Sequence, residues 1–200
     1  MPCVFLGARG ALNFRLEVDL REGAHHSGNW GGLLADPAMI LAHALASITD
    51  ARGQLAVPEW RPGSLTDEVR AAIRDLPLDG PEGPAIDPGW GEEGLTPAER
   101  CFGWNAFAVL AMESGVPAAP VNAIAGRATA VCQLRFVVGT DPDDILPALR
   151  RHLARAGVDQ VQVLEEDAQI MHATRQPLDH PWVQFVTASI EGTTGKAPHV

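Results

Sequence analysis

Two stretches of alternating apolar and polar residues predict strands of an antiparallel sheet. From Ala11 to Leu20, every second residue is apolar, which is the period of a strand with one buried face. Residues 128–138 alternate in the same way, with Gln133 and Arg135 on the polar side. An arginine on the outer face of an otherwise apolar strand needs water or an anionic partner.

Helical periodicity predicts two long helices that would cover the apolar face of this sheet. The first is expected over 37–50, because Asp36 suits the N-cap and the proline after it suits the first helical position. The second lies within 141–156. It contains Pro147, which is compatible with a regular helix only if that helix begins near residues 143–144.

Weaker patterns complete the order of elements. Short strands are expected at 55–60 and 161–163. A Thr-Pro-Ala-Glu sequence is typical of a capping box, and the helix it opens is expected over 96–113. One more helix is expected over 179–191, with the Trp182 side chain facing inward.

The order strand, helix, strand, strand, helix, strand indicates a fold class. It is the split β-α-β pattern of an α+β domain, a ferredoxin-like antiparallel sheet with two helices on one face. A Pro/Gly-rich insertion is expected to interrupt it over 61–118, because most of 61–94 has no periodic pattern.

Composition narrows the function classes. The chain has 200 residues, 46% of them hydrophobic, and a formal net charge of −10 without a basic cluster. One globular domain fits these values, and nucleic acid is a poor partner for it. Cys3, Cys101 and Cys132 are far apart and odd in number, which favours reduced thiols and a cytoplasmic protein. Neither a targeting segment nor a membrane span is expected, so no membrane partner is predicted.

Few residues fit a pattern for catalysis. A phosphate-binding loop, a dinucleotide fingerprint and a nucleophile elbow are all missing, and the acidic residues Glu92, Glu93, Glu165 and Glu166 are expected on the surface. The exception is the glycine-rich segment 25–32, where His25 and His26 follow a strand. An imidazole there could donate to a developing oxyanion. An ordinary surface turn and a weak two-histidine metal site remain alternatives.

Several short motifs, in their order along the chain, resemble one protein family. In the first half they are Gly7-Ala-Arg-Gly10, His26-Ser-Gly28, Gly31-Gly32 and Asp36-Pro37. In the second half they are Val121-Asn122-Ala-Ile124 and Gln133-Leu-Arg135-Phe136. Together they resemble the lid, or dimerisation domain, of the aminoacylase, carnosinase and glutamate carboxypeptidase family of zinc metallopeptidases (family M-twenty).

The resemblance implies roles for three residues. His26 would reach across a homodimer and stabilise the oxyanion in the partner's active site. Asn122 would assist in substrate or transition-state contacts, and Arg135 would bind the substrate carboxylate with its planar fork. Ala125 departs from the family pattern, which usually has proline there, so the turn after Asn122 is expected to be less rigid.

The resemblance also implies that this chain lacks part of the catalytic machinery of the family. The zinc ligands and the general base of the family belong to a catalytic domain, and nothing in this chain matches them. We therefore expect no cofactor in this chain, zinc or another divalent metal in the catalytic domain, and no activity of the chain alone. The expected division is a dimerisation domain at 7–168 and a return segment at 169–200. Substrates would be small peptides or N-acyl amino acids. A free-standing ferredoxin-like homodimerisation or ligand-binding module is the alternative.

Overall fold

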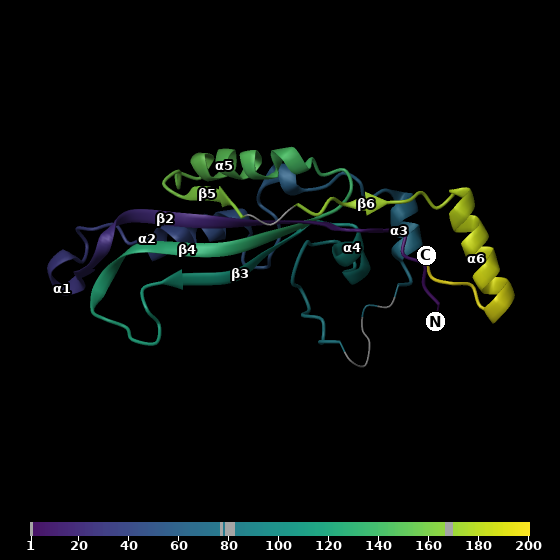
Figure 1. Cartoon of the computed structure of the whole chain (residues 1–200), viewed down its shortest axis with the longest axis horizontal. Helices are drawn as coiled ribbons and strands as arrows, with labels where there is room; N and C mark the ends of the chain where they lie inside the picture. Colours follow the sequence, from purple (N-terminus) through teal and green to yellow (C-terminus); the bar gives the residue numbers. More distant parts are fainter. Residues whose placement is uncertain (1, 77, 79–82, 167–169) are drawn as a thin grey trace.

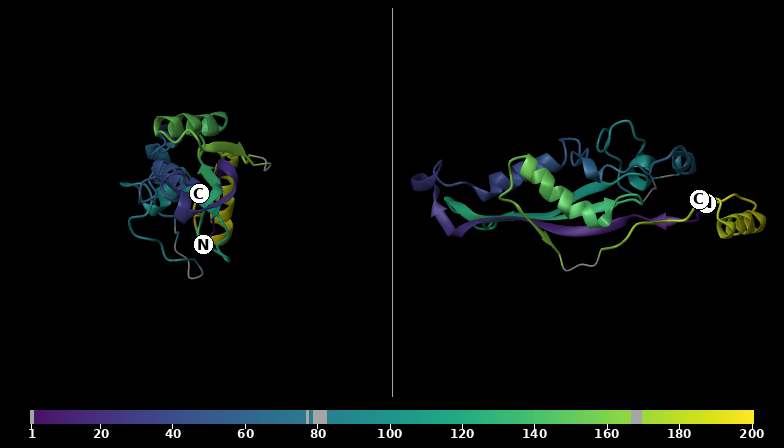
Figure 2. Two further views of the ribbon diagram at one scale, coloured as in Figure 1. Left: turned by 90° about the vertical axis from the view of Figure 1, so that its left-hand side faces the viewer. Right: turned by 90° about the horizontal axis from the view of Figure 1, so that it is seen from above.

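A computed structural model describes residues 2–76, 78, 83–166 and 170–200. Its main sheet has four antiparallel strands in the order β3-β4-β2-β5. The strands are β2 (Gly10–His26), β3 (Ala106–Ser114), β4 (Ala123–Phe136) and β5 (Gln162–Glu165). Helices α2 (Pro37–Ile48) and α5 (Ile145–Arg155) lie on the same face of this sheet (Figures 1 and 2). The prediction of a ferredoxin-like α+β domain is confirmed.

Shorter elements extend this core. A second, two-stranded sheet pairs β1 (Gly7–Ala8) with β6 (Thr174–Arg175). The remaining elements are short helices and one long helix near the end of the chain: α1 (Ser27–Trp30), η1 (Pro58–Trp60), α3 (Asp67–Ile73), α4 (Pro97–Phe102), η2 (Pro142–Asp144) and α6 (Pro181–Thr194).

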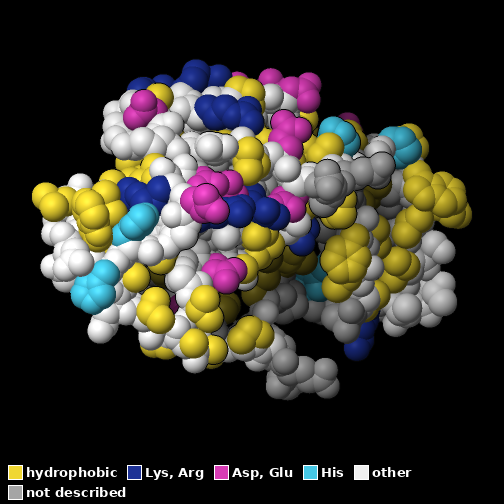
Figure 3. Space-filling model, turned by 60° about the vertical axis from the view of Figure 1, so that its left-hand side comes forward, with side chains coloured by type: hydrophobic (Ala, Val, Ile, Leu, Met, Phe, Trp, Pro, Cys, Tyr) yellow, Lys and Arg dark blue, Asp and Glu magenta, His cyan; other side chains and the backbone are white. Residues whose placement is uncertain are grey.

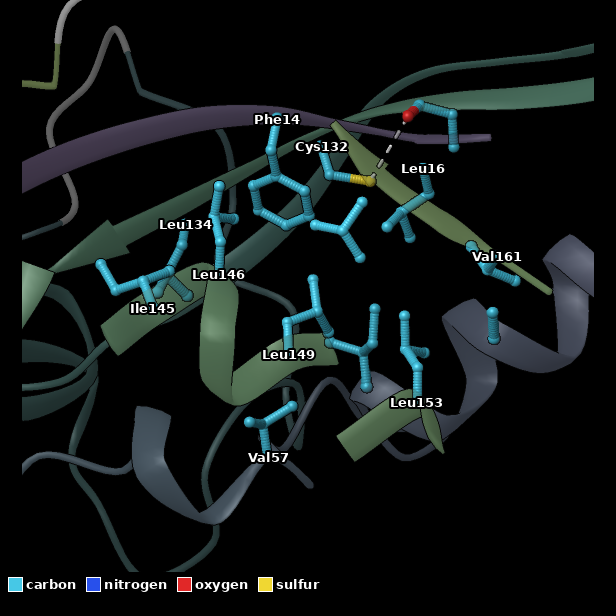
Figure 4. Close-up of a cluster of buried hydrophobic side chains, with 14 of the residues drawn as sticks. Phe14, Leu16, Val57, Cys132, Leu134, Ile145, Leu146, Leu149, Leu153 and Val161 are labelled. Carbon is cyan, nitrogen blue, oxygen red and sulfur yellow. Dashed lines mark hydrogen bonds between the residues drawn. The ribbon is translucent and has the colours of Figure 1, made fainter. Parts of the chain in front are cut away.

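The hydrophobic core lies between the sheet and the two helices (Figure 4). Phe14 and Leu16 of β2 and Cys132 and Leu134 of β4 are each fully buried there, and Leu12 packs against the edge of the cluster. Burying this alternating face against the helices supplies the main driving force for the fold. The outward residues of the same strands, Gln133 and Arg135 included, form the open face of the sheet.

The predicted starts of both helices are confirmed. The Asp36 carboxylate accepts a hydrogen bond from the Ala38 amide at the N-cap of α2. The regular part of α5 begins at Ile145, after the 3-10 turn η2, so Pro147 lies in the first turn, where its missing amide proton is harmless.

Two element assignments made from the sequence are wrong. The capping box of Thr96 and Glu99 is present, but its helix α4 ends at Phe102, and residues 106–114 form strand β3 instead of more helix. The second strand of the ferredoxin-like order is therefore β3, inside the segment expected as an insertion. Residues 55–60 contain one isolated bridge at Leu55 and the 3-10 turn η1.

The molecule is elongated along β2 and β4 (Figure 1). We call the end with His26, α1 and Asn122 the tip, and the opposite end of the sheet, with Arg135, β1 and β6, the root. Helix α6 lies beyond the root, and its orientation was predicted incorrectly, because Trp182 is 65% exposed while Val183 is buried. In the part of the chain that the structure describes, none of the helices is long and apolar enough to span a bilayer.

Candidate functional site

His26 is the last residue of β2 and the N-cap of α1. Its Nδ1 accepts a hydrogen bond from the Gly28 amide over 3.0 Å. A nitrogen that accepts from an amide carries no proton itself, so the neutral ring holds its proton on Nε2. The side chain is exposed, and this local turn therefore presents an N–H donor to the surroundings.

Asn122 is held beside His26 by two hydrogen bonds from Ser27, the residue that follows His26. The Ser27 amide and the Ser27 hydroxyl both donate to the Asn122 carbonyl oxygen, at 2.9 and 3.1 Å. Strand pairing reinforces this arrangement, because His26 is the register partner of Ala123. Two residues about a hundred positions apart in the sequence therefore share the tip. His25 faces Trp30 instead, with ring centroids 6.3 Å apart.

A bulge in β2 shapes the approach to the tip. The register with β4 shifts between Asp19 and Ala24, and Gly126 lies against the bulged backbone. A Cβ on Gly126 would lie 2.0 Å from the Arg21 carbonyl oxygen. The close backbone approach requires glycine at position 126. The bulge that makes this contact sets the direction of the last part of β2, which ends at His26.

Arg135 lies at the other end of β4. Its Nε donates to Gln133 Oε1 over 2.9 Å, and Gln133 Nε2 donates to Asn13 Oδ1 over 2.7 Å. The register partners of Arg135 are Ala11 and Ala106, so both neighbours on the open face are small. Its two terminal amino groups make no hydrogen bond or ion pair with another described residue. They are free to bind a carboxylate in two-pronged fashion.

The tip and the root are far apart. Ala123, beside His26, and Arg135 are separated by twelve steps of the same strand. At 3.3 Å per residue this distance is about 40 Å. The structure thus brings His26 and Asn122 together but does not bring either of them near Arg135 within one chain.

The edge strand β3 carries exposed apolar side chains between these two ends. Leu110 is 52% exposed and Met112 is 49% exposed. Figure 3 shows yellow hydrophobic side chains along the lower left of the view, on the side where β3 runs in Figure 1, with histidines at the same end. An apolar edge of this kind is suited to pairing with another strand.

The acidic residues do not form a metal centre. Glu92 is buried and ion-paired with Arg61, contrary to the expectation of a surface position, and Glu166 pairs with Arg15. Among the residues with described positions, there is no group of three or more His, Cys, Asp or Glu side chains that could hold a metal ion.

The family is established by comparison with known proteins. Residues 6–161 match the model of the peptidase dimerisation domain, and the chain belongs to this family. It is 32% identical over 80 residues to the Beta-Ala-His dipeptidase of Rattus norvegicus, and 39% identical over 57 residues to that of Homo sapiens. These matches cover 39% and 28% of the chain, but only 16% and 11% of the relatives.

Solved structures share the fold. A metallo-carboxypeptidase from Sulfolobus solfataricus superposes with a TM-score of 0.75 at 22% identity, and human carnosine dipeptidase 1 with 0.72 at 20%. Both matches cover 100% of this chain, which spans 46% and 44% of those chains. The chain is thus similar to slightly less than half of each peptidase.

His26, Asn122 and Arg135 are candidate site residues from the sequence, which does not show the contacts that hold each of them in place. The cross-strand pair of Asn13 and Gln133 has a sequence signal, since both lie on the polar faces of alternating strands. Their opposition depends on the strand register, which the sequence alone did not provide.

Proposed function

We propose that this chain is the dimerisation and active-site-completing domain of a metal-dependent peptidase or amidohydrolase of the dipeptidase or N-acyl amino acid deacylase type. On this proposal the chain alone hydrolyses nothing. Zinc, or another divalent metal, is bound by the part of such an enzyme that this chain does not cover. The observation that carries the proposal is the separation of about 40 Å between the His26 end and the Arg135 end of one sheet.

That separation favours a site built by two copies. A dipeptide is several times shorter than 40 Å, since each residue extends the chain by at most about 3.6 Å. One substrate therefore cannot contact His26 and Arg135 of the same chain. If both residues act on it, each must come from a different copy.

Pairing of the β3 edges would supply this geometry. In a symmetric dimer, two β3 strands that pair antiparallel continue the sheet from one copy into the next. The tip of each copy then extends past the root of its partner. The exposed outer side of α2, with Met39 at 58% exposure, is available to support the same interface.

The proposed roles follow from the side chains. His26, with its proton on Nε2, donates to the oxyanion that forms when the scissile carbonyl of the partner's substrate is attacked. Asn122 contacts the same substrate from beside His26. Arg135 binds the carboxylate of a substrate in its own copy's site.

His26→Ala in the full-length protein tests the first role. Loss of one oxyanion donor is expected to lower kcat by about a hundredfold to a thousandfold, with a much smaller change in KM. His25→Ala is the matched control and is expected to be mild, because His25 faces Trp30. A His26→Ala enzyme with normal turnover would contradict the role of this histidine.

Mixing two impaired variants tests the assembly, with the dipeptide carboxylate as the substrate. In a heterodimer of His26→Ala with Arg135→Met, one site receives both an intact His26 and an intact Arg135, and the other receives neither. Random exchange of equal amounts is expected to restore about a quarter of the wild-type sites, since half of the dimers are mixed. If verified heterodimers recover no activity, the residues do not act across the dimer.

A further inference from the structure

The side chains beside Arg135 on the open face of the sheet form a connected hydrogen-bond chain. It runs from Arg135 Nε to Gln133 Oε1, and from Gln133 Nε2 to Asn13 Oδ1. Asn13 and Gln133 are direct register partners on β2 and β4, and Arg135 follows on the same face of β4. The three side chains are half-buried. Their hydrogen bonds therefore compete less with water than they would at a fully exposed position.

The direction of these bonds is dictated by chemistry. A guanidinium has only donors, so Gln133 must turn its oxygen toward Arg135. The amide nitrogen of Gln133 then faces the other way and needs an acceptor, which Asn13 Oδ1 provides. The asparagine thus fixes which end of the glutamine amide faces the arginine.

We propose that Gln133, backed by Asn13, is a positioning residue that holds Arg135 with both terminal amino groups free for a substrate carboxylate. Gln133 accepts from the Nε–H group of Arg135. The N–H groups of both terminal amino groups therefore remain available to a carboxylate. The small partners Ala11 and Ala106 leave room on either side of the arginine. This inference rests on the proposed function of Arg135.

An arginine held in this way recognises a carboxylate with little loss of side-chain freedom on binding. Ordering a flexible arginine only at the moment of binding weakens affinity, because the lost rotamer entropy opposes the new contacts. Gln133 and Asn13 are therefore expected to determine how strongly the enzyme prefers a free carboxylate over an uncharged group at the same substrate position.

The test compares a dipeptide with its carboxamide in the full-length protein. The probe is β-alanyl-histidine, or the dipeptide hydrolysed fastest in a small panel, together with the same dipeptide amidated at its C-terminus. Gln133→Met keeps the side-chain length but removes the acceptor. It is expected to raise KM for the carboxylate substrate about tenfold, with kcat little changed, and to leave the carboxamide almost unaffected.

Asn13 supplies a graded second variant. Asn13→Leu removes the acceptor for Gln133 and is expected to shift KM in the same direction by a smaller factor. Asn13→Asp retains an acceptor oxygen and is expected to keep the carboxylate preference. Rescue by aspartate but not by leucine separates positioning from simple packing.

Thr129→Val is the matched control. Thr129 lies on the same face of β4, and its buried hydroxyl has no hydrogen-bond partner among the described residues. This variant should leave the carboxylate preference unchanged, and thermal unfolding of all variants identifies any that are simply misfolded.

Arg135→Met separates the positioning role of Gln133 from the carboxylate-binding role of Arg135. If it abolishes the carboxylate preference while Gln133→Met and Asn13→Leu preserve it, positioning by Gln133 is refuted and the role of Arg135 stands. If Arg135→Met also preserves the preference, the role proposed for Arg135 itself is wrong.

Discussion

At the scale of single residues, Cys132 is a titratable group inside the hydrophobic cluster between the sheet and the helices. Cys132 is fully buried between β4 and the helices, and its Sγ makes a weak hydrogen bond to the Ala130 carbonyl oxygen at 3.9 Å. Burial raises the pKa of the Cys132 thiol from 9.0 to about 12, because the thiolate would lose its hydration in the apolar core. The native state therefore keeps this proton at a pH where an unfolded chain releases it.

We predict that alkaline pH destabilises the fold through Cys132. The folded-state pKa lies above the unfolded value, so the contribution is complete below pH 9 and is lost as the pH rises toward 12. The full loss is on the order of 4 kcal/mol. Few other groups titrate in this range, because the chain has no tyrosine and Lys196 is its one lysine.

Urea unfolding between pH 8 and pH 11 would measure this effect. Cys132→Ala is expected to be less stable at neutral pH, but its free energy of unfolding should fall less steeply with rising pH. Cys3 and Cys101 remain in both proteins and cancel in the comparison. Equal slopes for the two proteins would mean that Cys132 does not govern the alkaline transition.

At the scale of elements, the contact between the β2 bulge and β4 determines where the tip lies. Gly126→Ala would place a methyl group 2.0 Å from the Arg21 carbonyl oxygen and 2.5 Å from that of Gly23. Backbone atoms cannot move aside locally, so the bulge must separate from β4. We predict a loss of roughly 1–3 kcal/mol of stability, together with lower activity of the full-length protein through displacement of His26.

Gly63→Ala is the control for this prediction. A Cβ there meets no atom within 4 Å, so the substitution should change the unfolding midpoint very little. Chemical denaturation of both variants provides the comparison. A Gly126→Ala protein as stable as Gly63→Ala would show that the bulge adapts without difficulty.

The elements also show how far the sequence could predict this fold. Alternation identified β2 and β4, and N-cap chemistry identified the start of α2, because in both cases one local pattern agrees with the tertiary contacts. Residues 106–112 read Ala-Phe-Ala-Val-Leu-Ala-Met, a composition that favours helix. They form β3 because the open edge of β4 satisfies their backbone groups, and the bulge between Val109 and Ala111 disrupts the alternation that would have revealed a strand.

Short motifs in the sequence nominate candidate site residues one by one, but they do not show how these residues are arranged in space. His26 and Arg135 were recognised from short motifs, whereas their distance from each other depends on the length and pairing of β4. Likewise, Gln133 was seen as a polar residue on a strand, and its link to Asn13 appears only with the register. Long-range pairing is the information that a single sequence carries least clearly.

At the scale of the whole molecule, the β3 edge is the surface that the proposed dimer would bury. Leu110 is the middle residue of β3 and is 52% exposed. In a symmetric strand pair, residues near the middle lie close to the twofold axis and face their own copies. A charge at position 110 would therefore face an identical charge across the interface.

We predict that Leu110→Lys dissociates the dimer. Two like charges brought together at an apolar interface repel each other and lose hydration, which is expected to raise the dissociation constant by at least about a hundredfold. Ile86→Lys is the control, because Ile86 is 47% exposed in a loop outside the strands and should tolerate the same change. Sedimentation velocity over a concentration series measures the effect.

In the full-length protein the Leu110→Lys monomer should also lose turnover, since neither copy can then receive the partner's His26. A wild-type chain that stays monomeric at high micromolar concentration would contradict this interface for the chain, and a Leu110→Lys protein that remains dimeric would place the interface on another surface.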